Sequence, residues 1–398
     1  MNDVRQQYEK WIYPIPVQDL EADRRGGTFD LSDPSLFRRK LWPRPVEPEK
    51  LKILIAGCGT TQAARVAYFN PASTVVGVDL SQASLAHESF LKSKHGLANL
   101  HLHCLSLLDI ETLGQQFDLI ISSGVLHHLP DPDAGLSALK KVLLPHGVMS
   151  IMVYGWYRRF GVYMMQETFR LLGVEQTESG VALVRETLAA LPSWHHVKSY
   201  SATAPDVKYD AGLVDTFLHP LDRAYSVKQV LQFAQDNGLR FQDWLDRQWY
   251  SIAGLIPDGL LIKEPARRLK IEDQWQLAEL LSQAIGSHRF LLCHPERDPQ
   301  DYSLDFANPE AWLNYIPYLR PAFDMLSPAD PQKGAPARYR RDSHEFPLDP
   351  SEVRMLALVD GTATIAQIIQ LSGMNADSAQ RLFARMHEWD HLMYQVPI

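Results

Sequence analysis

The sequence predicts an α/β protein built on a doubly wound, mostly parallel sheet. From Leu51 to Tyr154, apolar runs of strand length alternate with helical patterns. The first run ends in a turn that contains Gly57 and Gly59, and polar residues follow several of the later runs. Strands that alternate with helices form parallel sheets whose two faces are both covered.

The elements of this region are expected in a regular order. Ile53 to Ala56 is the first strand, and the glycine turn after it leads into a helix that starts at Gln62. Ser81 has the position and residue type of a helix N-cap. The other expected strands are 74–79, 100–104, 117–122 and 148–154, and the other expected helices are 81–94 and 134–144.

Beyond Tyr154 the alternation stops. We expect an inserted helical segment at about 156–225, with helices over 158–172 and 181–191. An irregular loop over 214–227, a helix over 226–237 and a strand over 238–244 follow. One or two amphipathic helices then cover 264–290, and a proline-rich, irregular stretch covers 295–336.

These patterns divide the chain into four expected segments: an arm over 1–50, the sheet domain over 51–250, a helical and proline-rich connection over 251–337, and a C-terminal domain over 338–398. Aromatic residues and prolines are so mixed in the arm that no continuous helix is expected there. Its Tyr8, Trp11 and Tyr13 either cover a ligand cleft or anchor the arm.

The last segment, with three expected helices and a strand over 393–396, resembles a winged-helix module. This segment contains six arginines and eight acidic residues, so it lacks the basic surface that DNA binding requires. Protein docking or dimerisation is therefore favoured over DNA recognition. A homodimer is therefore one alternative.

The composition excludes several classes of protein. The net charge of −8 argues against broad nucleic-acid binding. The start of the chain lacks the pattern of a signal peptide, and no apolar run is long enough to span a membrane. These features predict a cytoplasmic protein without a membrane partner. Three scattered cysteines provide neither a disulfide framework nor a cysteine-based zinc site.

Acidic residues and a histidine pair stand at the predicted carboxyl edge of the sheet, where ligands bind in doubly wound folds. Asp79 ends the second strand, 22 residues after Gly57, where a carboxylate can accept hydrogen bonds from a ribose. Asp109 follows the third strand and could accept a bond from an adenine amine. Each acid could instead be a first-turn helix charge. The segment Gly124 to His128 follows the fourth strand.

Together these residues resemble the class I S-adenosylmethionine-dependent methyltransferases. The likeness rests on ILIAGCGTTQ, VVGVDLS, Leu108-Asp109, FDLIISSGVLHHLPDP and LLPHGVMSIMVYG, and extends more distantly to about Trp244. It implies a Rossmann-like methyltransferase fold, with S-adenosylmethionine as cofactor and S-adenosylhomocysteine as product. In that family the glycine turn contacts the methionine part, the acid after the second strand binds ribose, and the acid after the third lies near adenine. The implied cofactor-binding residues are Gly57, Cys58, Gly59, Thr60, Gln62, Asp79, Leu80, Leu108, Asp109, Ser123, Gly124 and His127.

Two positions depart from the family pattern. Ile55 replaces the usual acid two residues before the first glycine, so another group must hold the amino group of the cofactor. Thr61 replaces the usual third glycine, which argues against an NAD-dependent dehydrogenase of the same sheet type.

A methyltransferase needs a base only if its nucleophile is protonated. Candidates are His127, His128, Tyr154, Asp215 and His219, of which His128, Tyr154 and His219 form the predicted catalytic set. No metal is expected, because adjacent histidines in a strand point to opposite faces.

Only looser likenesses indicate the class of acceptor. The insertion and the start of the chain resemble bacterial methyltransferases, some of them fused to peptide-repeat domains, which favours transfer to N or O of a protein or peptide. A small-molecule O- or N-methyltransferase is the alternative. A catalytically inactive cofactor-binding scaffold is a third possibility, motivated by Ile55.

Overall fold

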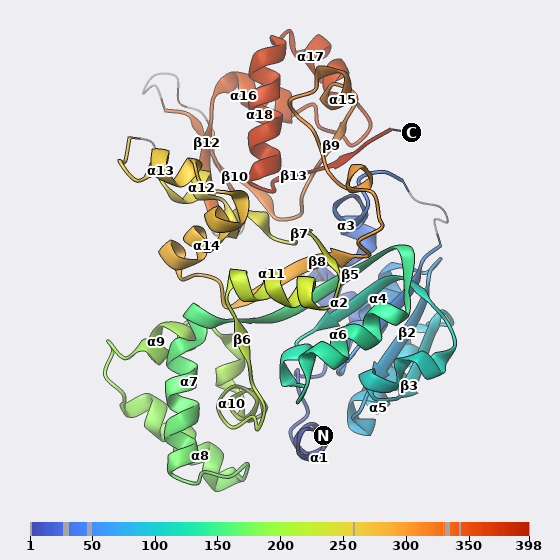
Figure 1. Cartoon of the computed structure of the whole chain (residues 1–398), viewed down its shortest axis with the longest axis vertical. Helices are drawn as coiled ribbons and strands as arrows, with labels where there is room; N and C mark the ends of the chain where they lie inside the picture. The colour runs from blue at the N-terminus through green and yellow to red at the C-terminus, as the bar shows by residue number, and fades with distance from the viewer. Residues whose placement is uncertain are drawn as a thin grey trace. The chain divides into compact units, whose positions relative to one another are not determined.

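The computed structural model describes residues 2–26, 32–45, 50–257, 259–328, 330, 335–341 and 344–397 (Figure 1). Internal contacts divide the chain into two units. Unit 1 comprises Met1–Asp30, Pro48–Trp244 and Glu279–Glu296, and unit 2 comprises Leu31–Glu47, Leu245–Ala278 and Arg297–Ile398. These boundaries differ from the four segments expected from the sequence, because each unit is assembled from three separate stretches of chain.

Unit 1 is built on an eight-stranded sheet with the order β3-β2-β1-β4-β5-β8-β7, and β6 pairs with β5. The first five strands pair in parallel, and β8 runs antiparallel to β5 and β7. The mostly parallel α/β sheet is therefore confirmed. The strands are β1 Lys52–Ala56, β2 Thr74–Asp79, β3 Leu100–Cys104, β4 Phe117–Ser123, β5 Leu143–Gly155, β6 Ala224–Tyr225, β7 Arg240–Trp244 and β8 Ser287–Cys293.

The chain order reverses between β1 and β4, because β2 and β3 lie on one side of β1 and β4 lies on the other. At such a switch point the loops after the two strands diverge and leave room for a ligand at their carboxyl ends. The turn after β1 and the segment after β4 are the two stretches that the sequence singles out.

The connecting helices of unit 1 are present where expected, except that the helix expected over 134–144 ends at Lys141 and the strand expected from Val148 starts already at Leu143. The Ser81 side chain accepts a bond from the Ser84 amide and caps the second helix, as expected. The segments are α4 Gln62–Phe69, α5 Gln82–His95, η1 Leu107–Leu113, η2 Leu126–His128, α6 Pro132–Lys141 and α11 Val227–Asp236.

The inserted segment forms a small helical group beside β6 (Figure 1). Its elements are α7 Trp156–Leu171, α8 Glu178–Ala190, α9 His196–Ser201, η3 Pro205–Lys208 and α10 Asp210–Phe217. The predicted loop over 214–227 is wrong at its start, because Val214 and Phe217 belong to α10 and pack into the apolar core of the insertion.

Two further expectations are corrected. The arm contains the helices α1 Asn2–Lys10, α2 Leu20–Arg25 and α3 Pro34–Leu41, since its prolines lie between helices or start them. Of the segment 264–290, only α13 Lys263–Arg267 and α14 Ile271–Ser282 are helical. The remainder enters β8, whose buried run SHRFLLC has no helical period.

Unit 2 contains a three-stranded sheet of the order β10-β11-β12 and a two-stranded sheet of β13 and β9. The expected irregular stretch over 295–336 is wrong in part, because it contains β9 and β10. The elements are η4 Arg247–Tyr250, α12 Ile252–Leu255, η5 Pro299–Asp301, α15 Pro309–Trp312, β9 Ile316–Leu319, β10 Phe323–Ser327, β11 Ala337–Arg341, β12 His344–Leu348, α16 Pro350–Leu356, α17 Ile365–Ser372, α18 Ala376–Glu388 and β13 Leu392–Gln395.

The three helices and final strand expected at the end of the chain are present as α16, α17, α18 and β13. The strand β13 pairs with β9, which lies before the expected domain boundary, and Trp312 packs into the same apolar core as Phe383. The winged-helix assignment stays a prediction. Among the described residues, no helix has the length and apolar character needed to span a membrane.

Candidate active site

The turn after β1 has a backbone that requires glycine at two places. Gly57 and Gly59 have φ angles of 79° and 57°, a region that residues with side chains rarely adopt. A Cβ atom at Gly57 would lie 2.3 Å from Val125 Cγ2, so the turn and the segment after β4 approach each other closely here. Cys58 is buried between them, and burial raises the pKa of its thiol. This cysteine therefore fills space as an uncharged thiol.

Asp79, the last residue of β2, is hydrogen-bonded to this turn. Its Oδ2 accepts a hydrogen bond of 2.8 Å from the Gly59 amide, and its Oδ1 accepts one of 2.9 Å from the Ser81 amide. Burial raises the pKa of Asp79, whereas these backbone bonds oppose the rise. The side chain is half-buried. Because each carboxylate oxygen can accept a second bond, Asp79 has the chemistry needed to hold a pair of hydroxyl groups.

The other predicted cofactor residues are distributed along the same edge. Asp109 is exposed in η1, and the neighbouring Leu108 is half-buried. Leu80 follows β2, Ser123 ends β4 and Gly124 follows it with a φ of 77°, and all three are half-buried. The strand ends thus bring these residues to one edge of the sheet, as expected from the parallel order.

Two amides at the start of α4 are bonded within the protein itself. A helix N-terminus normally offers unpaired amides to a ligand, but here Glu88 of α5 takes them. Its two carboxylate oxygens accept bonds of 2.9 and 2.8 Å from the amides of Ala63 and Ala64. Burial raises the pKa of Glu88 to about 8, although these two bonds oppose the rise. The half-buried Gln62 at the first helical position donates its amide to Cys58 O. Sequence reasoning missed Glu88, since an acid inside a helix normally faces solvent.

The arm lies directly on this turn. Thr60 is buried, and its hydroxyl donates to Pro14 O over 3.1 Å. A Cβ at Gly59 would lie 3.2 Å from Pro14 Cδ. Further along, Glu9 Oε1 accepts the Gln82 amide at the start of α5. The arm therefore runs past both the glycine turn and the end of β2.

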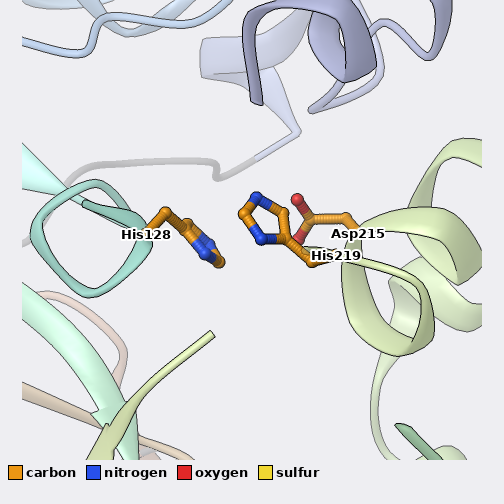
Figure 2. A group of neighbouring side chains, drawn as sticks. All are labelled: His128, Asp215 and His219. Atoms are coloured by element: carbon orange, nitrogen blue, oxygen red, sulfur yellow. The ribbon is translucent and has the colours of Figure 1, made fainter. Parts of the chain in front are cut away.

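A second group of polar side chains gathers around the segment after β4. Figure 2 shows His128 of η2 facing Asp215 of α10 and His219, which follows α10. All three side chains are buried, and one ring nitrogen of each histidine and one carboxylate oxygen of Asp215 lie within 4.8 Å of one another. The Tyr154 hydroxyl points to Asp215 Oδ2 at 3.4 Å. The predicted catalytic set of His128, Tyr154 and His219 is thus brought together, with Asp215 as its fourth member.

His127 lies beside this group, not on an opposite face. The two histidines belong to a 3-10 helix and not to a strand, so their ring centroids are only 4.2 Å apart. The strand-based reason against a shared site is therefore wrong. His127 is buried against the Tyr154 ring at 4.0 Å, and burial lowers the pKa of its imidazole. Neither ring nitrogen has a hydrogen-bond partner within the described residues.

Hydrogen bonds to Leu221 assign different tautomers to the other two histidines. His128 Nδ1 lies 2.8 Å from Leu221 O and must donate, so its Nε2 carries a lone pair. His219 Nδ1 accepts the Leu221 amide at 3.0 Å, so its Nε2 carries a proton. Burial lowers the pKa of His219 to about 2 and keeps this imidazole neutral. A metal ion would require a lone pair from each histidine, whereas this pair offers one acceptor and one donor.

A buried ion pair holds the wall of the site. Arg159 of α7 bonds Asp222 over 2.8 Å, and both side chains are 1% exposed. The guanidinium also stacks over the Tyr154 ring, 3.6 Å from its centroid. Gln166 donates a further bond to Asp222. Sequence reasoning missed this pair, because its partners are 63 residues apart and neither lies in a recognised motif.

The two clusters fit the implied cofactor. The glycine turn after β1 allows a ligand to approach the backbone closely. The Asp79 carboxylate beside it can accept hydrogen bonds from the ribose of an adenosine. The buried histidine group lies beyond it, after β4.

Comparison with known proteins agrees with these features. Residues 48–204 match the family model described as a methyltransferase domain. An uncharacterised protein of Synechococcus sp. is 29% identical over 344 residues, which cover 83% of this chain and 79% of that protein. The trans-aconitate 2-methyltransferase of Deinococcus radiodurans is 36% identical over 103 residues, or 26% of this chain and 37% of the enzyme.

Among solved structures, PKMT2 from Rickettsia typhi in complex with AdoHcy has the same fold. The TM-score is 0.65 at 18% identity, and the alignment covers 92% of this chain and 76% of that chain. The family model, the parallel sheet and the glycine turn followed by Asp79 lead to one assignment: residues 48–204 of this chain are a methyltransferase domain of the class I S-adenosylmethionine-dependent type.

Proposed function

We propose that this methyltransferase transfers its methyl group in line to an N or O nucleophile of a protein or peptide. The observation that carries the proposal is the buried group of His128, Asp215 and His219 beside Tyr154. It provides a base, a carboxylate and a hydrogen-bond donor next to the segment after β4. An inactive scaffold would have no need to keep such groups buried together, because burying them costs folding free energy.

The cofactor, when bound, supplies a methyl group on a positively charged sulfur. The glycine turn, Leu80, Leu108, Asp109 and the loop after β4 would position it, and Asp79 would accept bonds from its ribose. His128 Nε2 takes the proton of the nucleophile, and the nearby Asp215 carboxylate stabilises the imidazolium that forms. His219 Nε2–H and Tyr154 orient the acceptor. The buried surroundings exclude water, which would otherwise compete as a nucleophile.

A peptide acceptor is favoured by the surface of α7, which begins two residues after Tyr154. Trp156, Phe160 and Met164 are exposed at intervals of four residues and therefore share one face of the helix. Trp156 also stacks on Tyr163, whose hydroxyl points to Asp222. An apolar, aromatic face beside a reaction centre suits contact with side chains of a peptide. The small-molecule alternative would leave this face without a role.

Incubation with radiolabelled S-adenosylmethionine and a lysate of the source organism tests the acceptor class. We expect label in protein bands. Label confined to the small-molecule fraction would support the alternative class of acceptor. An absence of label in both fractions would support the inactive scaffold.

Replacing His128 by glutamine is expected to lower methyl transfer by about 100-fold, the lower end of the usual contribution of a general base. Glutamine can still form a hydrogen bond but cannot take a proton. His103→Gln on β3 is the matched control, because His103 is exposed and outside the cluster. Calorimetry should show unchanged cofactor affinity in both variants. Equal transfer rates in the two variants would rule out His128 as the base.

Gly57→Ala tests the close approach in the cofactor turn. The new methyl group would clash with Val125, so the turn or the segment after β4 must move. We expect this movement to weaken cofactor binding by roughly 100-fold, the size of effect that a misplacement of about 1 Å can have. Gly96→Ala is the control, since Gly96 also has a positive φ of 65° but nothing within 4 Å of the added Cβ. Calorimetry with S-adenosylhomocysteine measures both. A similar loss in both variants would mean that backbone strain, not the contact with Val125, controls affinity.

A further inference from the structure

The carboxylate of Asp215 is hydrogen-bonded to a tyrosine from the start of the chain, Tyr8. The Tyr8 hydroxyl of α1 donates to Asp215 Oδ1 over 2.8 Å, across 207 residues of chain. Within the described residues, the only other hydrogen bond to this carboxylate is the longer one of 3.4 Å from Tyr154. Asp215 is 2% exposed, so water does not replace a missing donor readily. Tyr8 therefore supplies the strongest hydrogen bond that orients this carboxylate.

From this geometry we propose that Tyr8 is a positioning residue for methyl transfer, which acts by holding the Asp215 carboxylate beside His128. The proposal rests on the proposed function of the histidine group. Asp215 Oδ1 is fixed by Tyr8, and one oxygen of the same carboxylate lies within 4.8 Å of one ring nitrogen of His128 and one of His219. An ionised carboxylate in this place favours the protonated form of a neighbouring imidazole.

The position of Tyr8 depends in turn on the arm. The Gln7 side chain accepts a bond from Gln176 of the insertion, and the Glu9 side chain accepts the Gln82 amide at the start of α5. Five residues further on, Pro14 O accepts the Thr60 hydroxyl in the glycine turn. One short stretch of chain therefore contacts the cofactor edge and the reaction centre together. The reaction centre is complete only while the arm is docked on the glycine turn.

The ionisation of Asp215 is the quantity that this arrangement controls. Burial raises the pKa of Asp215, whereas His128, the Tyr8 hydroxyl and Arg159 oppose the rise. Without the Tyr8 hydroxyl, Asp215 stays buried but loses a hydrogen bond that stabilises its ionised form. The pKa of Asp215 therefore rises further. The charged and titratable groups around Asp215, from all the elements that face it, are Tyr8, Tyr13, His128, Tyr154, Arg159, Tyr200, His219 and Asp222.

Tyr8→Phe in the full chain tests the proposal, with Tyr68→Phe as the matched control. Tyr68 also donates to a carboxylate, that of Glu21, over 2.6 Å, but outside the histidine group. Carbon-13 NMR of labelled aspartate, with Asp215→Asn to assign the signal, follows the titration. We expect the pKa of Asp215 to rise by about one unit or more in Tyr8→Phe and to stay constant in Tyr68→Phe. An unchanged titration in Tyr8→Phe would overturn the proposal.

Methyl transfer to the labelled acceptor provides the second measurement. Tyr8→Phe should lower the rate roughly tenfold and move the acidic limb of the pH profile to higher pH, because Asp215 loses its charge earlier. A rate loss without this displacement would reduce Tyr8 to a structural anchor. The NMR titration needs no methyl acceptor. It therefore tests the effect of Tyr8 on Asp215 even if the lysate shows no methyl transfer and the proposed function is wrong.

Discussion

Asp79→Asn is expected to weaken S-adenosylmethionine binding by roughly 100-fold. Hydrogen bonds to a charged group contribute about 1.5–3 kcal/mol, and the ribose would lose its charged acceptor. The substitution also affects the turn, because one carboxylate oxygen becomes an amide that faces the donor group of Gly59 or Ser81. Calorimetric titration measures the affinity, and circular dichroism verifies the fold.

Asp109→Asn is the control for this prediction. Asp109 is exposed, and its side chain has no hydrogen bond to any described residue, so loss of its charge should change the cofactor affinity only severalfold. Because the pKa of Asp79 is raised by burial, cofactor affinity of the natural protein should fall as the pH falls towards that value. The affinity of Asp79→Asn should lack this dependence. Equal losses of affinity in Asp79→Asn and Asp109→Asn would contradict a special role of the acid after β2.

The sequence predicted the parallel part of unit 1 well. Strands buried on both faces appear as unbroken apolar runs, and β2 and β3 occupy the predicted positions. Tight turns also leave a local signal, since Gly57 and Gly59 have the backbone angles that their residue type suggests. Because parallel strands end at one edge of the sheet, the sequence alone was enough to predict that the proposed cofactor residues lie close together.

Features that depend on distant contacts could not be predicted. The strand β8 belongs to the sheet only because it pairs with β5, from which it is separated by more than a hundred residues. The buried Glu88 resembles any polar helix residue until the position of α4 is known. The bond between Tyr8 and Asp215 joins two segments that sequence patterns place in an arm and in a loop. Pattern reasoning found the histidines, Tyr154 and Asp215 of the site, but not the bond by which Tyr8 orients Asp215.

Asp390→Asn is expected to destabilise unit 2 by about 3–5 kcal/mol, the usual result of removing one partner from a buried ion pair. Asp390 is 2% exposed and bonds Lys40 over 2.9 Å and also Arg320, while the Arg247 amide donates to it over 3.2 Å. Asparagine keeps the shape of the side chain and tolerates the positive φ of 59°. The substitution therefore removes the charge and leaves two buried cations without this counter-charge.

The loss of stability in Asp390→Asn is expected to depend on pH. Burial opposes ionisation of Asp390, but Arg320, Lys40, Arg247 and Arg341 outweigh it and hold its pKa well below the usual range. A carboxylate with a lowered folded-state pKa contributes stability above its unfolded value of about 3.9, and this contribution is lost as the pH falls. The difference in unfolding free energy between the natural protein and Asp390→Asn should therefore shrink below about pH 4.

Hydrogen exchange of the amides in α18 and β13 reports on unit 2 separately, which matters because two units need not unfold together. Glu345→Gln is the control, since its pair with Arg338 is exposed and solvent screens it. Faster exchange in Asp390→Asn at pH 7, with little change in Glu345→Gln, is the expected result. Equal protection in the two variants would mean that the apolar core around Phe383 stabilises unit 2 without help from the buried charges.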